Sequence, residues 1–199
     1  MSNYQSFRRS ESNKRGRQGE KNFEEQVMKP RNWNYKLASA RENKVGHFDF
    51  KVEGLGTIDV KSVKKISRSH FKATEDVIWL EITNDRGLDG WVKAETLDYV
   101  AFERENDFVL VGRKLLVNII NEKCDLNNVV SNTEQALYSL YKRGWRRPDG
   151  TVSQDSITMI RMSDVTNINS GSVTIYKKIG EEIPIGEQSE KKYQKIELI

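Results

Sequence analysis

Residues 47–62 read HFDFKVEGLGTIDVKS, and this stretch decides which fold the chain is expected to adopt. Apolar and polar residues alternate on both sides of a glycine-containing turn, a pattern that predicts two strands of one hairpin. The apolar side chains of each expected strand share one face, which the pattern assigns to the core. The other face carries Asp49, Asp59 and Lys61. The hairpin is therefore expected to bury itself and still bring two carboxylates and an ammonium group together.

These three charged residues indicate phosphodiester chemistry. Asp59 and Lys61 are two residues apart on one expected strand, so they are separated by about 6.6 Å along it and their side chains point the same way. A hairpin partner can place Asp49 beside them. Two carboxylates offer the hard oxygen ligands that Mg²⁺ prefers, and a neighbouring lysine can orient a water molecule or stabilise charge on phosphorus oxygens. The competing interpretation is that all three residues simply face solvent.

Context, and not the acid-x-lysine pattern itself, distinguishes this site. The same pattern also occurs as Glu42-Asn43-Lys44, Asp49-Phe50-Lys51 and Glu190-Lys191-Lys192. Only Asp59-Val60-Lys61 lies in an alternating strand and also follows an acid on a neighbouring alternating strand. The three charged residues of the hairpin are therefore the candidate catalytic group.

The arrangement resembles the PD-(D/E)xK nuclease superfamily, in which an acid is followed by a strand-turn-strand interval and then by an acid-x-lysine motif. Here nine residues separate Asp49 from Asp59-Val60-Lys61. The segment Arg15-Gly16-Arg17-Gln18-Gly19-Glu20 is similar to the basic opening of archaeal Holliday-junction resolvases and related phage nucleases, which precedes a catalytic glutamate. Ser62 completes a VKS ending that is common in that group. The resemblance covers residues 15–65.

The resemblance implies an α/β fold with a restriction-endonuclease-like core, in which a central mixed sheet is flanked by helices. It implies that Glu20, Asp49 and Asp59 hold Mg²⁺, or Mn²⁺ in its place, and that Lys61 assists the attacking water. It also implies a homodimer that acts on DNA. From the residues alone, Glu20 is equally a solvent-facing acid near a helix N-terminus, and Glu24, one turn further, is a weaker candidate.

Hydrophobic periodicity predicts the other elements. Helices are expected over residues 17–30, 114–123 and 132–144, the last capped by Asn132 or Thr133. Residues 35–53 are expected to be extended. Further strands are expected over residues 77–84, 97–103, 107–113, 155–165 and 171–179, and the pair 97–103 and 107–113 is expected to form a hairpin. The chain divides into a basic flexible arm (1–17), a nuclease-like α/β domain (18–178) and a polar C-terminal tail (179–199).

Positive charge is concentrated in the N-terminal arm. Residues 1–17 hold five basic residues and one acid, which leaves 28 basic and 28 acidic residues in the rest of the chain. Such an arm binds polyanions through counterion release, and a solubilising tail would have the same composition. Residues 141–150, YKRGWRRPDG, interleave basic residues with a tryptophan, which suits backbone clamping and base stacking or a loop around a core tryptophan. The candidate nucleic-acid-binding residues are Arg8, Arg9, Arg15, Arg17, Lys64, Lys65, Arg68, Arg143, Arg146 and Arg147.

Composition narrows the class of protein. No apolar run reaches the length of a membrane span and the N-terminus lacks a signal-peptide core, so no membrane partner and a cytoplasmic location are expected, in a host cell if the chain is phage-encoded. Cys124 is the one cysteine, which excludes an internal disulfide and predicts a buried small apolar residue. Two histidines disfavour a histidine-based zinc site. No helix start follows the hairpin glycines, so no organic cofactor is expected. His47 and Glu81 either border the site or face water.

The expected function is therefore that of a Mg²⁺-dependent endonuclease that hydrolyses phosphodiester bonds in DNA, with branched or otherwise structured DNA as the substrate. Two alternatives stay open. One is a nucleic-acid-binding or protein-interaction module that keeps the nuclease fold without cutting. The other is an RNase on the same scaffold.

Overall fold

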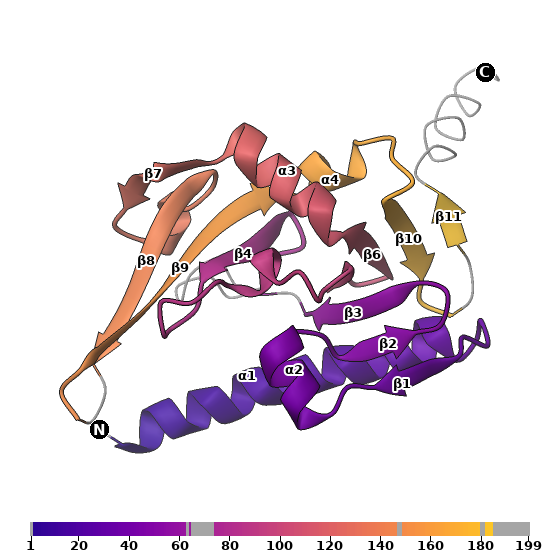
Figure 1. Ribbon diagram of the computed structural model, residues 1–199, viewed down its shortest axis with the longest axis horizontal. Helices are drawn as coiled ribbons and strands as arrows, with labels where there is room; N and C mark the ends of the chain where they lie inside the picture. The colour runs from indigo at the N-terminus through magenta and orange to yellow at the C-terminus, as the bar shows by residue number, and fades with distance from the viewer. Residues whose placement is uncertain (1, 63, 65–73, 147–148, 180–181, 185–199) are drawn as a thin grey trace, which may run out of the picture.

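A seven-stranded mixed β-sheet forms the centre of the protein (Figure 1). The computed structural model describes residues 2–62, 64, 74–146, 149–179 and 182–184. The strand order is β1-β2-β3-β5-β6-β10-β11, and every neighbouring pair is antiparallel except β3 and β5, which are parallel. The strands are β1 (Tyr35–Leu37), β2 (Phe50–Val52), β3 (Gly56–Lys61), β5 (Tyr99–Glu103), β6 (Asp107–Gly112), β10 (Val173–Lys177) and β11 (Glu182–Pro184).

A second sheet of four strands lies beside the first, in the order β4-β9-β8-β7. Its long antiparallel strands β8 and β9 extend toward the N-terminal end of the molecule in Figure 1. The strands are β4 (Val77–Thr83), β7 (Asp125–Val130), β8 (Ser139–Arg146) and β9 (Val152–Arg161).

Helices flank the central sheet on both faces. The long helix α1 (Ser2–Phe23) continues into a π-helical turn, η1 (Glu24–Met28), whose residues pack on one face. Helix α3 (Arg113–Lys123) and the short helix α4 (Met162–Thr166) contribute to the core on the other face. Three shorter helices lie in connections: α2 (Ala40–Gly46), η2 (Trp91–Lys93) and η3 (Thr133–Gln135).

Two clusters of buried apolar side chains follow from this arrangement, one on each face of the central sheet. The smaller cluster packs Phe23, Val27 and Met28 of α1 and η1 against strand residues that include Phe50 and Ile58. The larger cluster joins the opposite face to α3, α4 and the second sheet. Alternating strand residues serve the two clusters, as period-two patterning requires.

The chain is an α/β protein with mixed sheets flanked by helices, as expected. The 47–62 hairpin forms as β2 and β3, with Gly54 (φ 77°) and Gly56 (φ 116°) in the left-handed region that its turn needs. The expected hairpin of β5 and β6, the helix α3 and the strand β10 are also confirmed. Cys124 is partly buried against the larger cluster, close to its predicted setting.

The N-terminal segment, which is expected to be a flexible arm, has a helical backbone. Ser2–Phe23 form one helix, so the boundary expected at residue 17 lies inside α1. No proline interrupts residues 2–23, and their arginine, lysine, glutamine and glutamate residues have good helix propensity. The buried turn at Phe23 supplies a nucleus from which the helix extends backwards at little further cost.

The expectation of an extended chain over residues 35–53 is wrong between β1 and β2, where α2 forms. A reciprocal capping box starts that helix: Ser39 Oγ accepts a hydrogen bond from the Glu42 amide, and the Glu42 carboxylate accepts one from the Ser39 amide. The left-handed residue His47 ends it, with φ of 54°. Within HFDFKV, the strand β2 therefore begins only at Phe50, and His47 is the cap that ends α2.

The helix expected over residues 132–144 is also wrong. Only Thr133–Gln135 are helical, with Asn132 as the cap that accepts a hydrogen bond from the Gln135 amide. Ser139–Arg146 form β8 because both neighbours, β7 and β9, pair with it. The strand expected over residues 77–84 is present as β4 but lies in the second sheet, which the sequence did not predict.

Two further boundaries differ from the prediction. The strand expected over residues 155–165 is β9, which begins three residues earlier and gives way to α4 at Met162. Within the expected C-terminal tail, Glu182–Pro184 pair with β10 as the edge strand β11. Residues 180–181 and 185–199 of that tail lie outside the described part of the chain.

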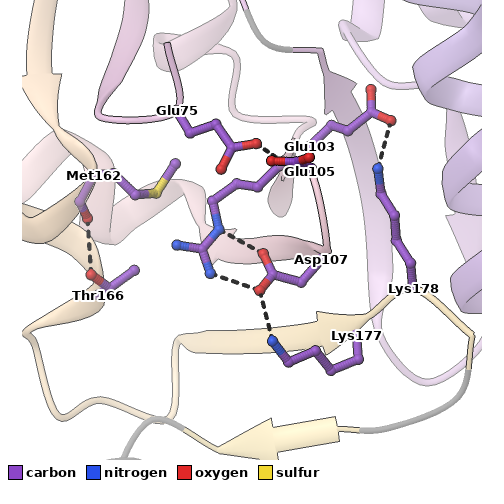
Figure 2. A network of polar contacts seen from close by, with 9 residues as sticks. Glu75, Glu103, Glu105, Asp107, Met162, Thr166, Lys177 and Lys178 are labelled. Atoms are coloured by element: carbon purple, nitrogen blue, oxygen red, sulfur yellow. Dashed lines mark hydrogen bonds and ion pairs between the residues drawn. The ribbon is translucent and has the colours of Figure 1, made fainter.

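A polar network links the neighbouring ends of β5, β6 and β10 in the central sheet (Figure 2). The buried Asp107 carboxylate accepts hydrogen bonds from Arg104 Nε and Nη2 at 2.6 and 2.9 Å, and from Lys177 Nζ at 3.3 Å. Lys178 Nζ lies 3.2 Å from the Glu103 carboxylate, which also accepts a 2.7 Å hydrogen bond from Asn22 of α1. The network therefore ties α1 to β5 and to the end of β10. None of the helices in the described residues is both long and apolar enough to cross a membrane.

Candidate active site

A cavity of about 290 Å³ opens at the C-terminal end of β3 and collects the candidate catalytic residues. Four short segments contribute to it: the middle of α1, the end of α2 with the residues that follow it, the end of β3, and the chain just beyond. The residues from these segments are Arg15, Gly16, Glu20, Asn43, His47, Asp49, Asp59, Val60, Lys61, Ser62 and Lys64.

Asp49 is fixed in the wall of this cavity by two hydrogen bonds. Its Oδ1 accepts a 2.6 Å hydrogen bond from Asn43 Nδ2, and its Oδ2 accepts a 2.7 Å hydrogen bond from the Val60 amide. The backbone amide of Asp49 donates to Ile58 O, which continues the β2–β3 ladder up to the site. Helix α2 therefore positions the first acid, through a residue that lies one turn before the helix ends.

Asp59 is almost completely buried and faces Lys61 along β3. The Lys61 ammonium lies 2.5 Å from Asp59 Oδ2, and the side chain of Lys61 is 25% exposed against 6% for Asp59. The contact is a charge-assisted ion pair, in which the ammonium and the buried carboxylate stabilise each other's charged form. The ammonium also lies 5.2 Å from the centre of the buried Trp91 ring, which attracts cations over its face.

Burial and neighbouring charges shift the pKa values of the three charged groups. Burial first, and the neighbouring Asp59 charge second, raise the pKa of Asp49 to about 7 against the hydrogen bond from the Val60 amide. Burial also raises the pKa of Asp59, against the attraction of Lys61. Burial alone would lower the pKa of Lys61, but the carboxylates around it, Asp59 first, raise it overall. The lysine is therefore positively charged at neutral pH.

Glu20 reaches the same cavity from α1 because the helix lies unusually close to the end of β3. A methyl group at Gly19 would come within 2.0 Å of Ser62 Oγ, and Ser62 donates a 3.1 Å hydrogen bond to the Arg15 carbonyl. Burial raises the pKa of Glu20, and the Asp49 charge acts in the same direction. Glu24, the weaker candidate, is turned to Tyr35, whose hydroxyl donates to it at 2.6 Å.

The chemistry of these groups fits a divalent cation held by a pair of carboxylates. Mg²⁺ in proteins is usually bound through one or two carboxylates, with water and substrate phosphate in its other positions. Asp49 and Asp59 form such a pair, and Asp59 Oδ2 is buried with the Lys61 ammonium against it. The described residues contain no group of three or more His, Cys, Asp or Glu side chains placed to hold a metal. Glu20 therefore lines the cavity without completing the three-carboxylate group that the resemblance implies.

The expected nucleic-acid-binding residues fall into three groups. Arg15 and Lys64 line the cavity, and Arg17 is close enough to lower the pKa of Glu20. Arg143 and Arg146 lie on β8 of the second sheet, where the Arg143 guanidinium is paired with Asp155. Arg8 and Arg9 belong to α1, but only their backbone is described. Lys65, Arg68 and Arg147 lie outside the described residues.

The structure adds three residues that sequence reasoning missed or left open. Asn43 holds Asp49, and the Ser39-to-Glu42 capping box was the available signal for the helix that carries it. Trp91 lies under the Lys61 ammonium through a long-range contact with no sequence signal. Glu81 is half-buried on β4 and is not among the residues that line the cavity; burial raises the pKa of its carboxyl group, against the charge of Lys61. His47 lines the cavity, so the first of its two expected positions, at the site and not in water, is the one observed.

Comparisons with known proteins add no relative: no family model matches the chain, and no curated protein or solved structure matches it significantly. The likeness to the PD-(D/E)xK superfamily therefore depends on the motif residues and on the geometry described above.

Proposed function

We propose that this chain is a divalent-metal-dependent nuclease of the PD-(D/E)xK type, with structured DNA as its substrate. The observation that carries the proposal is the convergence of Asp49, Asp59 and Lys61 at one cavity, where the Lys61 ammonium lies 2.5 Å from a buried Asp59 oxygen. A structural ion pair alone would not require a second buried acid beside it, because an unneutralised pair of buried carboxylates is destabilising.

Each residue has a role that follows from its surroundings. Asp49 and Asp59 would hold Mg²⁺, which when bound lowers the pKa of a water molecule and neutralises charge on the phosphate. Lys61 keeps its proton because carboxylates surround it, so its ammonium can donate hydrogen bonds to a phosphate oxygen. Arg15 and Lys64, at the cavity margin, supply cations for the neighbouring phosphates. Asn43 keeps the Asp49 carboxylate oriented.

One observation favours the alternative of a module that binds nucleic acid without cutting. The described residues hold no ready group of three metal-ligating side chains, and Lys61 already neutralises Asp59. Such a module would keep the basic surfaces and would not respond to Mg²⁺. Cleavage assays separate the two functions directly.

The first test replaces Asp59 by Asn and Lys61 by Ala. Linear, nicked, flapped and four-way DNA, and a labelled RNA in parallel, are incubated with the protein in Mg²⁺ or in EDTA. We expect cleavage of DNA that needs Mg²⁺, a loss of about 100-fold or more in either variant, and DNA binding within a few-fold of the parent. Cleavage of RNA alone would select the RNase alternative.

Two residues of the same hairpin serve as matched controls. Lys51 and Glu53 are exposed and lie outside the cavity, so Lys51→Ala and Glu53→Gln should cut at the parent rate. Equal cleavage by the parent and both site variants would reject the assignment. Binding without cleavage under every condition would establish the non-cutting module instead.

A further inference from the structure

Lys61 occupies the place in this site where a bound cation would be most strongly attracted. Its ammonium lies 2.5 Å from Asp59 Oδ2, an oxygen of an almost completely buried carboxylate. Asp49 is the next carboxylate along and also acts on the ammonium. A monovalent ammonium and a divalent cation cannot both sit against this oxygen, because their charges repel at short range.

The ring of Trp91 gives the ammonium a second site of attraction beside Asp59. The ring centre lies 5.2 Å from Lys61 Nζ, within the range of a cation–π interaction. Trp91 begins η2 and is 4% exposed, so its ring is a fixed surface. When Lys61 leaves Asp59, its flexible side chain can therefore move across the face of the Trp91 ring.

Glu81 of β4 packs against Gly90, the residue directly before Trp91. The two residues are so close that a methyl group at Gly90 would lie 2.9 Å from Glu81 Cγ and 2.1 Å from Glu81 O. The Glu81 carboxylate is half-buried. Burial raises its pKa, and no hydrogen bond is among the causes of the shift. Lys61 is the foremost charge acting on it, ahead of Asp155 and Lys64. A partly buried carboxylate next to a lysine, without a hydrogen bond of its own, is a ready acceptor for that lysine.

We propose that Lys61 takes the place of the divalent cation in the metal-free site and moves to Glu81 when the cation binds Asp49 and Asp59. Glu81 is then the positioning residue that holds Lys61 beside the scissile phosphate. The inference rests on the proposed function, because it assumes a divalent cation at the two aspartates. In the metal-free site the ammonium then balances the charge of Asp59, the carboxylate it contacts.

A double-mutant cycle on cation binding tests the exchange without relying on catalysis. MgCl₂ is titrated calorimetrically into the full chain as the parent, Lys61→Met, Glu81→Gln and the double variant. We expect Lys61→Met to tighten Mg²⁺ binding about tenfold, because the competing cation is gone. Glu81→Gln should weaken it about tenfold when Lys61 is present and less than about twofold when it is absent. A general charge effect would weaken binding equally in both backgrounds.

Two further variants complete the design. Glu81→Asp keeps the charge and should restore part of the lost affinity, whereas Glu53→Gln removes an exposed acid outside the cavity and should change nothing. Equal effects of Glu81→Gln in the two backgrounds would overturn the exchange and leave the nuclease proposal standing if the parent still cuts DNA with Mg²⁺. A parent chain that binds no Mg²⁺ would overturn both.

Discussion

Asp49 is the residue at which folding and function oppose each other most directly. It is only 8% exposed, and its two hydrogen-bond donors are neutral groups that cannot cancel a full negative charge. Burial and the charge of Asp59 therefore raise its pKa to about 7. A carboxyl group whose pKa is raised to near 7 in this way is typical of active sites, and structural ion-pair networks also produce such shifts.

This raised pKa predicts how stability depends on pH in EDTA. The ordinary pKa of an aspartate carboxyl group is 3.8 and the pKa of Asp49 in the folded protein is about 7, so the folded state binds the proton more tightly than the unfolded state. The favourable contribution is complete below pH 4 and is lost as pH rises to 7, by up to roughly 4 kcal/mol. Asp49→Asn has no such proton to lose. We therefore expect its melting temperature to rise relative to the parent between pH 5 and pH 8.

The comparison of the two proteins at each pH removes the contributions of titrating groups outside the site, which the two proteins share. Thermal unfolding followed by circular dichroism at half-unit pH steps provides the measurement. A difference in melting temperature that stays constant from pH 5 to pH 8 would show that Asp49 ionises in the folded protein as it does in the unfolded chain.

At the scale of elements, the sequence predicted the strands and helices that a short-range residue pattern encodes. The alternation in residues 47–62 predicted β2, β3 and the approach of Asp49 to Asp59, because side-chain direction on a strand repeats every two residues. The segment Ser139–Arg146 has no comparable local signal, and its strand state comes from pairing with β7 and β9. The contacts of Trp91 and Glu81 with the site likewise depend on how the second sheet packs, which no single segment encodes.

The junction between α1 and β3 gives a prediction at this scale. A methyl group at Gly19 would lie 2.0 Å from Ser62 Oγ and 3.0 Å from Glu103 Oε2, whereas one at Gly16 has its nearest neighbour at 4.0 Å. Alanine improves helix propensity at both positions by about 1 kcal/mol. Gly16→Ala should therefore stabilise the protein, and Gly19→Ala should be less stable than Gly16→Ala by about 1–3 kcal/mol because the helix must move away from Ser62.

Urea unfolding of the two variants measures this difference, and Ser62→Ala supplies the control. Removing the Ser62 hydroxyl takes away the closest atom and leaves Glu103 Oε2 at 3.0 Å, the end of a flexible side chain, and Ser62 Cβ at 3.4 Å. The Gly19→Ala defect should shrink in the Ser62→Ala background. Equal stability of the Gly16 and Gly19 variants would mean that α1 does not approach β3 as closely as described.

At the scale of the whole molecule, α1 joins the site to the surface beyond it. The turn at Phe23 lies in the smaller core cluster, Glu20 lines the cavity, and the first half of the helix extends past the central sheet (Figure 1). Basic residues along this extension thus lead away from the cavity in one direction. A nucleic acid strand bound in the cavity would meet this positive segment as it leaves, and phosphate contacts of this kind contribute affinity without sequence preference.

This arrangement predicts that α1 sets much of the salt dependence of DNA binding. Arg8, Arg9 and Lys14 are replaced together by glutamine in an Asp59→Asn background, which permits binding in EDTA without cleavage. Each lost phosphate contact lowers the slope of log K against log salt by about 0.9, so three contacts lower it by about 2.7. Affinity should fall by a similar factor for unrelated sequences, because these contacts read no bases.

A matched triple variant separates this local effect from the loss of net charge. Lys36, Lys51 and Lys114 are exposed on β1, β2 and α3, and none of them lines the cavity. Their replacement by glutamine removes the same three charges, so a slope that depends only on net charge would fall equally in both triples. If the helix lies along the DNA, the slope falls only when its own residues are changed, because counterions are released where protein cations meet phosphates and not elsewhere on the surface. An unchanged slope in the α1 triple would place the DNA path on another side of the cavity.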